Sequence, residues 1–423
     1  MIAQVGLGYK LTEAGVIPED WEVVQLNDLG GNSKPAIKAG PFGSAITKSM
    51  YVPNGYKVYG QEQVIRGDCW YGDYFIPQST YKNLESCSVI PGDILLSLVG
   101  TTGKLLVLPA GAPAGIINPR LIRFSFDKSR VDSRFFKELF ETEQVQSYLD
   151  RHSQGGTMGV LNAGMLRPVV IQLPSLDEQR AIASALSDMD ALISGLGQLI
   201  DKKRDLKQAA MQQLITGQQR LPGYSDEWEL KRLDEIGVFL KGSGVRRDQS
   251  LSGDLPCIRY GEIYTVHNDY IREFQSYISV SISEEATLIK CGDIMFAGSG
   301  ETKEDIGKCV SLIDDVEAYA GGDIVILRPK NVDSLFLGYA LNAPSSRRQK
   351  ASRGQGDAVV HISANALATI EVLMPNQAEQ TAIATILSDM DSELTALETR
   401  RNKARHLKQG MMQELLTGRI RLL

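Results

Sequence analysis

The chain has 423 residues, 43% of them hydrophobic and 23% charged, so it is long enough for two or more globular domains and does not have the composition of a disordered protein. Its formal net charge of −6 excludes a uniformly basic clamp for polyanions. Five cysteines without a C-x-x-C pair, and four histidines without zinc-ligand spacing, predict a reduced, cytoplasmic protein without a structural metal, and no apolar run of membrane length is present.

Residues 18–173, called module 1, have the pattern of a mixed α+β domain. Trp21 precedes a short strand predicted at residues 23–26, and an apolar run between Gly and Pro predicts another strand at 94–99. Phe and Leu residues at helical spacing predict a helix over 132–149. Trp21 is expected to anchor the core, as large aromatic residues usually do. Module 1 contains 15 Lys and Arg against 15 Asp and Glu, so a nucleic-acid surface here requires an uneven distribution of charge.

A long amphipathic helix is predicted from Asp177 to Gly217. Ser175, followed three residues later by Glu178, is an N-cap pattern, and Gly217 suits the left-handed residue that ends a helix. Gly195 weakens the helix and indicates either a close helix crossing or a bend. About 40 residues correspond to a rod of about 60 Å, which favours an exposed spacer or dimerising rod over a buried core helix. The apolar positions alternate in steps of four and three, as in a coiled-coil seam: Ile182, Leu186, Met189, Ile193, Leu196 and Ile200.

The same arrangement returns about 201 residues later. Residues 378–391 repeat residues 177–190, and module 2, residues 225–374, starts with Trp228 before a strand predicted at 230–233 and contains a helix predicted over 333–349. Module 2 carries 16 Lys and Arg against 23 Asp and Glu. The second seam is Ile383, Leu387, Met390, Leu394 and Leu397. Further matches are Gly43-Ser44 with Gly242-Ser243, Tyr59-Gly60 with Tyr260-Gly261, Gly92-Asp93-Ile94 with Gly292-Asp293-Ile294, and Val131-Asp132-Ser133 with Val332-Asp333-Ser334. The chain is therefore an internal duplication.

The sequence lacks the patterns of a self-sufficient enzyme. Gly103-Lys104 and Gly307-Lys308 lack the other residues of a P-loop, and there is no G-x-S-x-G elbow. His152 and His361 are not equivalent under the repeat, so the modules share no catalytic histidine. We therefore predict a non-catalytic protein.

In this order, the motifs resemble the specificity (S, HsdS) subunit of type I restriction-modification enzymes over nearly the whole chain. In module 2, Leu240-Lys241-Gly242-Ser243 and Gly354-Gln355-Gly356-Asp357 depart from the glycine motifs of that family. The stretches that carry the resemblance are Tyr9 to Val23, Gly40-Pro41-Phe42-Gly43-Ser44, Val99-Gly100-Thr101-Thr102-Gly103, Gly155-Gly156-Thr157 with Leu161-Asn162, Leu173-Pro174 to Ile182, and Thr216-Gly217-Gln218-Gln219-Arg220-Leu221.

The resemblance implies an α+β fold in which two target recognition domains are separated by two long helices that form an antiparallel coiled coil, with an internal pseudo-twofold repeat. The expected segments are 1–173, 174–222, 223–374 and 375–423, alternating recognition domain and helix. Each domain is expected to read one half of a bipartite site in double-stranded DNA, with half-sites about 34 Å apart. Two methyltransferase (M) subunits and endonuclease-translocase (R) subunits are the expected partners. No cofactor is expected in this chain, whereas S-adenosylmethionine, ATP and Mg are expected on the partner subunits.

Candidate DNA-binding residues are cations near the glycine motifs, expected to bind phosphates, and neighbouring polar residues, expected to read base edges. In module 1 they are Lys38, Ser44, Thr47, Lys48, Gln61, Gln63, Arg66, Thr101, Thr102, Lys104, Arg151, Gln154 and Thr157. In module 2 they are Lys241, Ser243, Arg246, Arg247, Arg259, Glu262, Ser299, Lys303, Arg347, Arg348, Arg353 and Gln355. For each of them, an ordinary solvated surface position is the alternative.

Candidate partner-binding residues lie off the seams of the long helices and are repeated or nearly so: Gln179, Arg180, Asp188, Gln380, Ser388 and Asp389. They are expected to dock M subunits, and the alternative is that they only cap and solubilise the helices. Two other protein classes stay open at this point. One is a non-DNA scaffold of two binding modules with a coiled-coil spacer, and the other is a self-sufficient enzyme, which requires cofactor binding by the chain alone.

Overall fold

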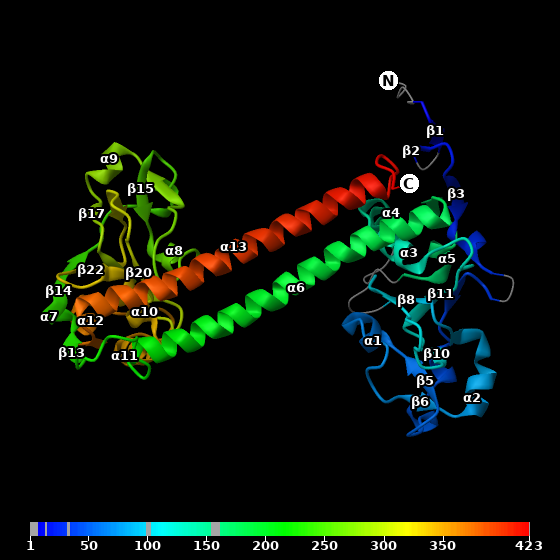
Figure 1. The fold of residues 1–423 in the computed structure, drawn as a ribbon, viewed down its shortest axis with the longest axis horizontal. Coiled ribbons are helices and arrows are strands. Elements are labelled where there is room, and N and C mark those ends of the chain that lie inside the picture. The colour runs from blue at the N-terminus through cyan, green and yellow to red at the C-terminus, as the bar shows by residue number, and fades with distance from the viewer. Residues whose placement is uncertain (1–6, 13–14, 32–33, 99–102, 154–160, 423) are drawn as a thin grey trace. The chain divides into compact units, whose positions relative to one another are not determined.

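The polypeptide forms two units, and the first of them joins segments from both ends of the sequence. The computed structural model describes residues 7–12, 15–31, 34–98, 103–153 and 161–422. Unit 1 consists of Met1–Leu196 with Arg400–Leu423, and unit 2 of Gly197–Thr399 (Figure 1). Each unit therefore contains one module, the start of one long helix and the end of the other. The predicted segment boundaries stay predictions, because these units divide the long helices.

Unit 1 contains two four-stranded sheets, ordered β6-β5-β10-β7 and β4-β11-β8-β9, and two smaller pairs, β1-β2 and β12-β3. All pairs are antiparallel except β5 with β10. The strands are β1 (Tyr9–Thr12), β2 (Gly15–Pro18), β3 (Glu22–Gln25), β4 (Ile37–Ala39), β5 (Tyr56–Tyr59), β6 (Phe75–Ile76), β7 (Ser88–Val89), β8 (Ile94–Ser97), β9 (Leu105–Val107), β10 (Gly115–Ile117), β11 (Leu121–Phe124) and β12 (Val170–Leu173). The helices are α1 (Gln61–Arg66), α2 (Gln78–Asn83), α3 (Ser133–Phe140), α4 (Glu143–Ser153), α5 (Ala163–Leu166) and α6 (Leu176–Ile215).

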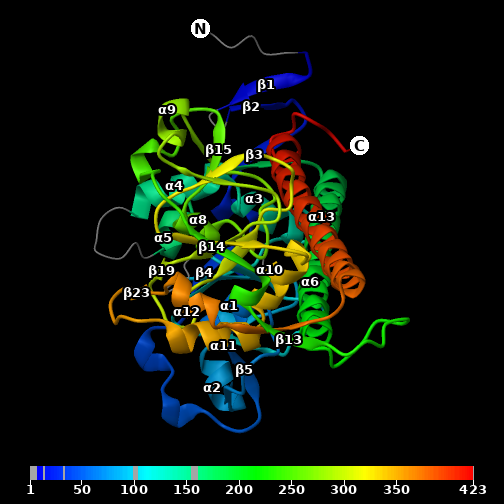
Figure 2. The ribbon, with the colours of Figure 1, turned by 90° about the vertical axis from the view of Figure 1, so that its left-hand side faces the viewer.

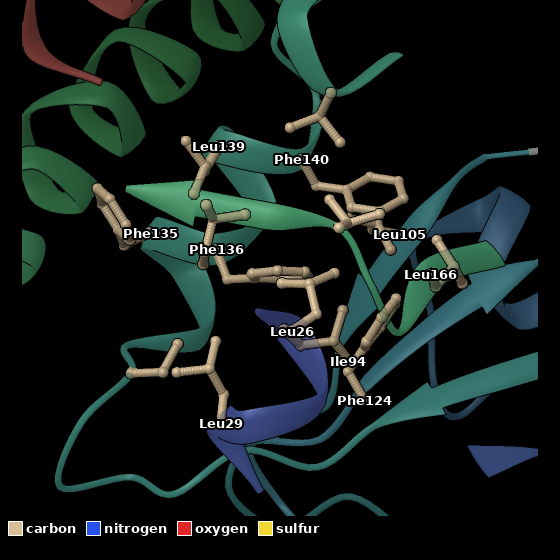
Figure 3. Packing of buried hydrophobic residues seen from close by; sticks show 14 of the residues in the cluster. Leu26, Leu29, Ile94, Leu105, Phe124, Phe135, Phe136, Leu139, Phe140 and Leu166 are labelled. Atoms are coloured by element: carbon tan, nitrogen blue, oxygen red, sulfur yellow. The ribbon is translucent and has the colours of Figure 1, made fainter. Parts of the chain in front are cut away.

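The sheet that contains β8 is buried on both faces. Ile94 and Leu96 point into a core formed with α3 and α5, in which Leu26, Phe124 and Phe136 also pack (Figure 3). Leu95, between them, belongs to the core of the other sheet. Successive strand residues point to opposite faces, so burial on both sides requires a continuous apolar run rather than alternation. This explains the run of apolar residues that predicted the strand.

Unit 2 repeats this topology with sheets ordered β16-β15-β21-β17 and β14-β22-β18-β20. In both views α9 and β15 lie at one end of the module and α11 and α12 at the other (Figures 1 and 2). The strands are β13 (Glu229–Arg232), β14 (Gly237–Lys241), β15 (Leu255–Ile258), β16 (Ser276–Ile278), β17 (Thr287–Ile289), β18 (Ile294–Ala297), β19 (Ser299–Gly300), β20 (Cys309–Ser311), β21 (Ala318–Ala320), β22 (Ile324–Pro329), β23 (Val360–His361) and β24 (Glu371–Met374). The helices are α7 (Leu233–Ile236), α8 (Tyr260–Thr265), α9 (Val280–Ser283), α10 (Ser334–Asn342), α11 (Pro344–Arg353), α12 (Ala364–Ala368) and α13 (Gln377–Leu415).

The repeated topology corrects two of the matches proposed from the sequence. The amide of Gly40 donates to Leu121 O at the start of β11, and the amide of Gly242 donates to Ile324 O at the start of β22. Gly242 is therefore equivalent to Gly40, not to Gly43. In the same way, the helices α1 and α8 start after Gly60 and Arg259, so Gly60 corresponds to Arg259 and the match with Gly261 is wrong.

The helices predicted over 132–149 and 333–349 are each divided in two. In unit 2, Pro344 begins α11, and Ala343 before it is extended, because a residue that precedes proline avoids the helical region. In unit 1, the side chain of Gln146 donates to Phe140 O, which is one of the last carbonyls of α3. Asp132 and Asp333 are the N-caps of α3 and α10, with side chains that accept backbone N–H groups of the first turn.

The two long helices form as predicted. Gly217 and Gly418 follow α6 and α13 in the left-handed conformation, with φ of 67° and 70°. Within unit 2, Lys203 pairs with Glu393 and Lys207 with Asp391, so the residue numbers rise along α6 as they fall along α13, and the helices are antiparallel. All predicted seam residues are buried or half-buried. No described atom outside the helix lies within 4 Å of the place where a Cβ on Gly195 would be, so of the two explanations given for this glycine, the close helix crossing is wrong.

The first turn of each long helix holds a buried glutamate. Glu178 and Glu379 are N3 residues. The amide of Glu178 donates to Ser175 Oγ, and the amide of Glu379 donates to Asn376 Oδ1. Their carboxylates do not follow the expected capping-box pattern. Instead, Trp21 Nε1 donates to Glu178 Oε2 and Trp228 Nε1 donates to Glu379 Oε2, both at 3.1 Å. Trp21 is fully buried and Trp228 half-buried, so both tryptophans anchor their modules to the start of a long helix.

Candidate nucleic-acid interface

In unit 1, four loops meet at one margin of the module, which we call edge 1: residues 38–51, 60–63, 98 with 103–104, and 118–120. Backbone hydrogen bonds connect them: Gly40 donates to Leu121 O, Asn118 to Tyr59 O, and Leu98 to Arg120 O. A Cβ on Gly40 would lie 1.9 Å from Asn118 O, so only glycine allows the first loop to approach the last one. The glycine motif of module 1 therefore determines how these loops are assembled.

The charge of module 1 is concentrated at edge 1. Its residues include four cations, Lys38, Lys48, Lys104 and Arg120, and one acid, Glu62. The whole module has equal numbers of cations and acids. The uneven distribution that DNA binding requires of a neutral module is therefore present here.

Unit 2 assembles equivalent loops at edge 2, defined as residues 241–249, 258–262, 298–303, 320–323 and 354–362. Gly321 donates to Ile258 O, Gly298 to Asp323 O and Ile362 to Gly298 O. Edge 2 contains five cations and five acids, whereas the module contains 16 and 23. Edge 2 is thus neutral within an acidic module.

Backbone strain occurs at edge 2, next to its two adjacent arginines. Val245 has φ of 46°, in the left-handed region that is unusual for a β-branched residue, and Asp323 has φ of 60°, which an aspartate adopts more readily. Gly322 donates to Gly244 O and connects the segment of Val245 with that of Asp323. Val245, Arg247, Arg259, Tyr260 and Asp323 line a cavity of 440 Å³. Strained backbone of this kind is common at ligand sites, because it fixes side chains in one orientation.

Several predicted DNA-binding residues are exposed at these edges. At edge 1 they are Thr47, Lys48 and Lys104, with Lys38 and Gln61 half-buried. At edge 2 they are Lys241, Ser243, Arg246, Arg247, Lys303 and Gln355, with Arg259 half-buried. In the part of the chain that the structure describes, the guanidinium groups of Arg246 and Arg247 have no hydrogen-bond or ion-pair partner. The guanidinium group of Arg259 already has one partner within the module, because its Nε donates to Oε1 of Glu262 at 2.9 Å.

Four predicted DNA-binding residues are instead used inside the modules. Gln63 and Glu262 are the N3 residues of α1 and α8, are nearly fully buried, and accept the amides of Gly60 and Arg259. Ser299 is 6% exposed, and its hydroxyl pairs with Nδ1 of His361 at 2.9 Å. Arg353 donates to the side chain and carbonyl of Thr369. These polar groups satisfy internal partners, so we remove them from the candidate interface.

The remaining predicted residues lie apart from the edges or outside the described residues. Arg66 stacks on the Tyr71 ring at 4.0 Å, and Arg151 on α4 donates to Ser147 O. Arg347 and Arg348 are exposed on α11. Thr101, Thr102, Gln154 and Thr157 fall outside the described part of the chain, as does the side chain of Ser44.

Arg120 is an edge residue that the sequence reasoning missed. It is exposed, and its amide donates to Oδ1 of Asn118 at 2.9 Å, which fixes the turn between β10 and β11. The Asn118-Pro119 pair is a turn signal that would have placed Arg120 on a loop. Phe42, which is 90% exposed, was missed as well.

On the long helices, two of the six predicted partner-binding residues are buried. Gln179 accepts the amide of Asp132 and donates to Arg130 O and Pro174 O. Gln380 accepts the amide of Asp333 and donates to Pro375 O. Both side chains join the helix to its own module, so a docking role for them is wrong. Arg180, Asp188 and Asp389 are exposed and Ser388 is half-buried, so these four stay candidates.

Among the described residues, no three His, Cys, Asp or Glu side chains are grouped so as to hold a metal ion. None of the described helices has the length and apolar character needed to span a membrane.

The comparisons with known proteins agree with one another. The family model of the type I restriction modification DNA specificity domain matches residues 18–202 and 225–404. The chain is 22% identical over 433 residues to the type I restriction enzyme MjaVIII specificity subunit of Methanocaldococcus jannaschii, which covers 96% of this chain and 94% of that protein. It is 23% identical over 442 residues to the putative MjaX specificity subunit of the same organism, covering 98% of this chain and 97% of that protein.

Solved structures share the fold. The crystal structure of a type I restriction-modification S subunit from M. genitalium aligns with a TM-score of 0.57 at 15% identity, covering 96% of this chain and 97% of that one. A chain from a study of complex assembly and conformational transition of the type I R-M system aligns with a TM-score of 0.55, also at 15% identity, covering 96% and 99%. At this identity, the likeness concerns the fold.

Proposed function

Because this chain belongs to the family of type I restriction-modification DNA specificity proteins, we propose that each of its modules reads one half of a bipartite sequence in double-stranded DNA. The main support for DNA binding is edge 1, where glycine-dependent loops bring together four cations and one acid in a module that has no net charge. Phosphates bind the cations at each edge, and polar side chains between them contact base edges. The family match gives no support to the alternative of a non-DNA scaffold.

The long helices are proposed to determine the spacer between the half-sites and to dock two M subunits. The modules are joined to α6 and α13 by buried contacts, Gln179 and Trp21 in unit 1, and Gln380 and Trp228 in unit 2. Such contacts hold each module firmly on its helix. Arg180, Asp188, Ser388 and Asp389 are the candidate docking residues. Charge reversal at Asp188 and Asp389 that leaves co-purification of M subunits intact would assign these acids to solvation only.

The chain is proposed to be non-catalytic, with methyl transfer and DNA cleavage on partner M and R subunits. S-adenosylmethionine, ATP and Mg belong to those partners in this proposal, and the cytoplasmic location stays a prediction.

The experiment is a map of modified bases across the source genome, obtained by sequencing that detects methylation directly, with this gene intact and deleted. A bipartite motif that is present only with the intact gene is the expected result. Replacing residues 225–374 with those of a related protein should change one half of the motif and keep the other. A change in both halves would contradict one module per half-site, and absence of any gene-dependent motif in cells that contain the M partner would overturn the proposal.

A further inference from the structure

Phe42 is the most exposed phenylalanine of this chain. The chain has 11 phenylalanines, all within the described residues, and the other ten are buried or half-buried, while Phe42 is 90% exposed. An exposed phenylalanine ring lacks the stabilisation that burial gives to the other rings. Edge 1 also exposes Met50, at 37%, and single apolar side chains are common on protein surfaces. The loop and the charges around Phe42 therefore indicate what kind of partner the ring suits.

The loop that carries Phe42 is firmly built. Gly40 donates to Leu121 O and packs against the Asn118 carbonyl too closely for any side chain. Ala45 donates to Phe42 O at 2.8 Å and closes a 3-10 turn at Gly43–Ala45. The backbone of Phe42 is therefore fixed from both sides, while its ring extends to solvent. A side chain presented from a fixed loop needs little ordering when it binds.

The neighbours of Phe42 at edge 1 are suited to duplex DNA. Lys38 lies on β4, two residues before Gly40, Lys48 lies on the same segment as Phe42, and Arg120 lies on the loop against which Gly40 packs. There is no acid within residues 38–51. An apolar ring among cations is complementary to duplex DNA, in which phosphates surround a stack of apolar base faces. Some proteins that bend DNA insert a phenylalanine ring between adjacent base pairs.

Module 2 has no counterpart of this ring. Since Gly242 corresponds to Gly40, the position of Phe42 corresponds to Gly244, which has φ of 66°. Edge 2 instead presents Arg246 and Arg247 a few residues later. The two halves of the duplication therefore differ in the chemistry that they offer at the same loop.

We propose that Phe42 inserts between two adjacent base pairs in the half-site read by module 1, and that module 2 causes no such unstacking. This inference rests on the proposed function. It predicts that the two half-sites respond differently to binding, with a local opening of the base stack in one of them only.

The test uses the full chain, assembled with its M partners, and duplexes in which 2-aminopurine replaces single bases along both half-sites. Binding of the unchanged protein should raise 2-aminopurine fluorescence several-fold at one step in the module 1 half-site and at no step in the other. F42A should abolish that rise and weaken binding by about tenfold, because the stacking that the ring gains is largely offset by the unstacking of the base pairs. F42W should retain the rise, because its ring also stacks.

Leu11→Ala is the matched control, because Leu11 is an exposed apolar residue of the same unit, 63% exposed on β1. It should leave affinity and fluorescence unchanged. Equal 2-aminopurine fluorescence with F42A and with the unchanged protein would overturn the insertion. The insertion would also be overturned if F42A binds more weakly but the unchanged protein produces no rise in fluorescence. Failure of the unchanged complex to bind any bipartite sequence would instead overturn the proposed function itself, so the two failures are distinguishable.

Discussion

Arg220 and Glu379 are 159 residues apart in sequence, and two hydrogen bonds of 2.8 and 2.7 Å join the guanidinium group of one to the carboxylate of the other. Arg220 follows α6, and Glu379 lies in the first turn of α13. The relationship recurs in unit 1, where Arg421 follows α13 and binds Glu178 in the first turn of α6. Each buried glutamate thus joins the end of one long helix to the start of the other.

We expect Arg421→Ala to loosen the first turns of α6 and leave the start of α13 unchanged. Glu178 is fully buried, and removing the arginine leaves its charge with Trp21 as the main donor. Hydrogen bonds to charged groups contribute about 1.5–3 kcal/mol, and partial exposure of Arg421 favours the low end, so amide exchange there should accelerate by about tenfold. Hydrogen exchange measured by mass spectrometry checks this. Arg220→Ala is the control: it should accelerate amide exchange at the start of α13 and leave the start of α6 unchanged. Uniform acceleration of exchange in both units would contradict a local role for each arginine.

The two modules differ in an otherwise equivalent buried aspartate. Asp293 receives two hydrogen bonds from Arg328, at 2.8 and 2.7 Å. Asp93 lies 3.9 Å from Arg123, whose Nε and Nη2 are buried without a hydrogen-bond partner among the described residues. We expect D93N to cost less than about 1 kcal/mol and D293N about 2 kcal/mol, because only the second breaks a well-formed pair. Denaturant unfolding of each variant measures the difference, and equal losses would contradict it.

The same aspartate predicts a pH dependence. Burial raises the pKa of Asp93, although hydrogen bonds from Ser125 and Ile90 oppose this. Its folded-state pKa is then above the unfolded value of about 3.9, so this group adds stability as the pH falls through the folded-state pKa. The unchanged protein should therefore gain stability relative to D93N on acidification. The free energy of unfolding of both proteins, measured from pH 7 down to the onset of acid unfolding, should diverge, whereas parallel curves would exclude the effect.

Arg246 and Arg247 are expected to bind phosphates. Replacing both with Ala should lower the slope of log affinity against log salt by about 1.8, since each phosphate contact contributes about 0.9. Binding titrations of the full complex from 50 to 300 mM salt measure the slope. The control replaces Arg232 and Lys330, which lie outside edge 2, and should leave the slope unchanged. An unchanged slope in the double edge variant would remove these arginines from the interface.

Gly195 is expected to be a weak point of α6. It is exposed, and its missing Cβ would meet no atom outside the helix. G195A should raise the free energy of unfolding by up to about 1 kcal/mol, because alanine loses less backbone entropy in a helix. The equivalent residue of α13, Ala396, supplies the control: A396G should lower stability by a similar amount. Lower stability of G195A would show that the helix needs a glycine here.

The long helices were predictable because their signals are local. The seam, the caps at Ser175 and Asn376, and the glycines that follow each helix depend on neighbours within a few turns. The α+β fold followed from the duplication and the family resemblance, and the structure confirms it. Exposed cations next to the glycine loops were also found, since charge and loop position both appear in the sequence.

The roles of buried polar residues were not predictable, because they depend on tertiary partners. Gln63 and Gln179 have the same chemistry whether they read a base or satisfy a buried amide, and the structure assigns both to internal partners. The register of the two modules failed for a related reason. The number of residues between equivalent positions of the two modules changes inside diverged loops. The glycine Gly242 was therefore matched to Gly43 by a chance identity, although its true equivalent is Gly40. Hydrogen bonds to the neighbouring strands resolve that ambiguity, and the sequence does not contain them.

The composition of the two units has a consequence for synthesis on the ribosome. Unit 2 is one continuous stretch, Gly197–Thr399, and has all its residues once that stretch has emerged. Unit 1 is made first but also requires Arg400–Leu423, which supply Lys408 to Asp190 and Arg421 to Glu178. The first unit of the nascent chain is therefore still incomplete while the second unit folds, because Arg421, which contacts Trp21 and Glu178, has not yet been synthesised. The module that leaves the ribosome first is the last to be finished.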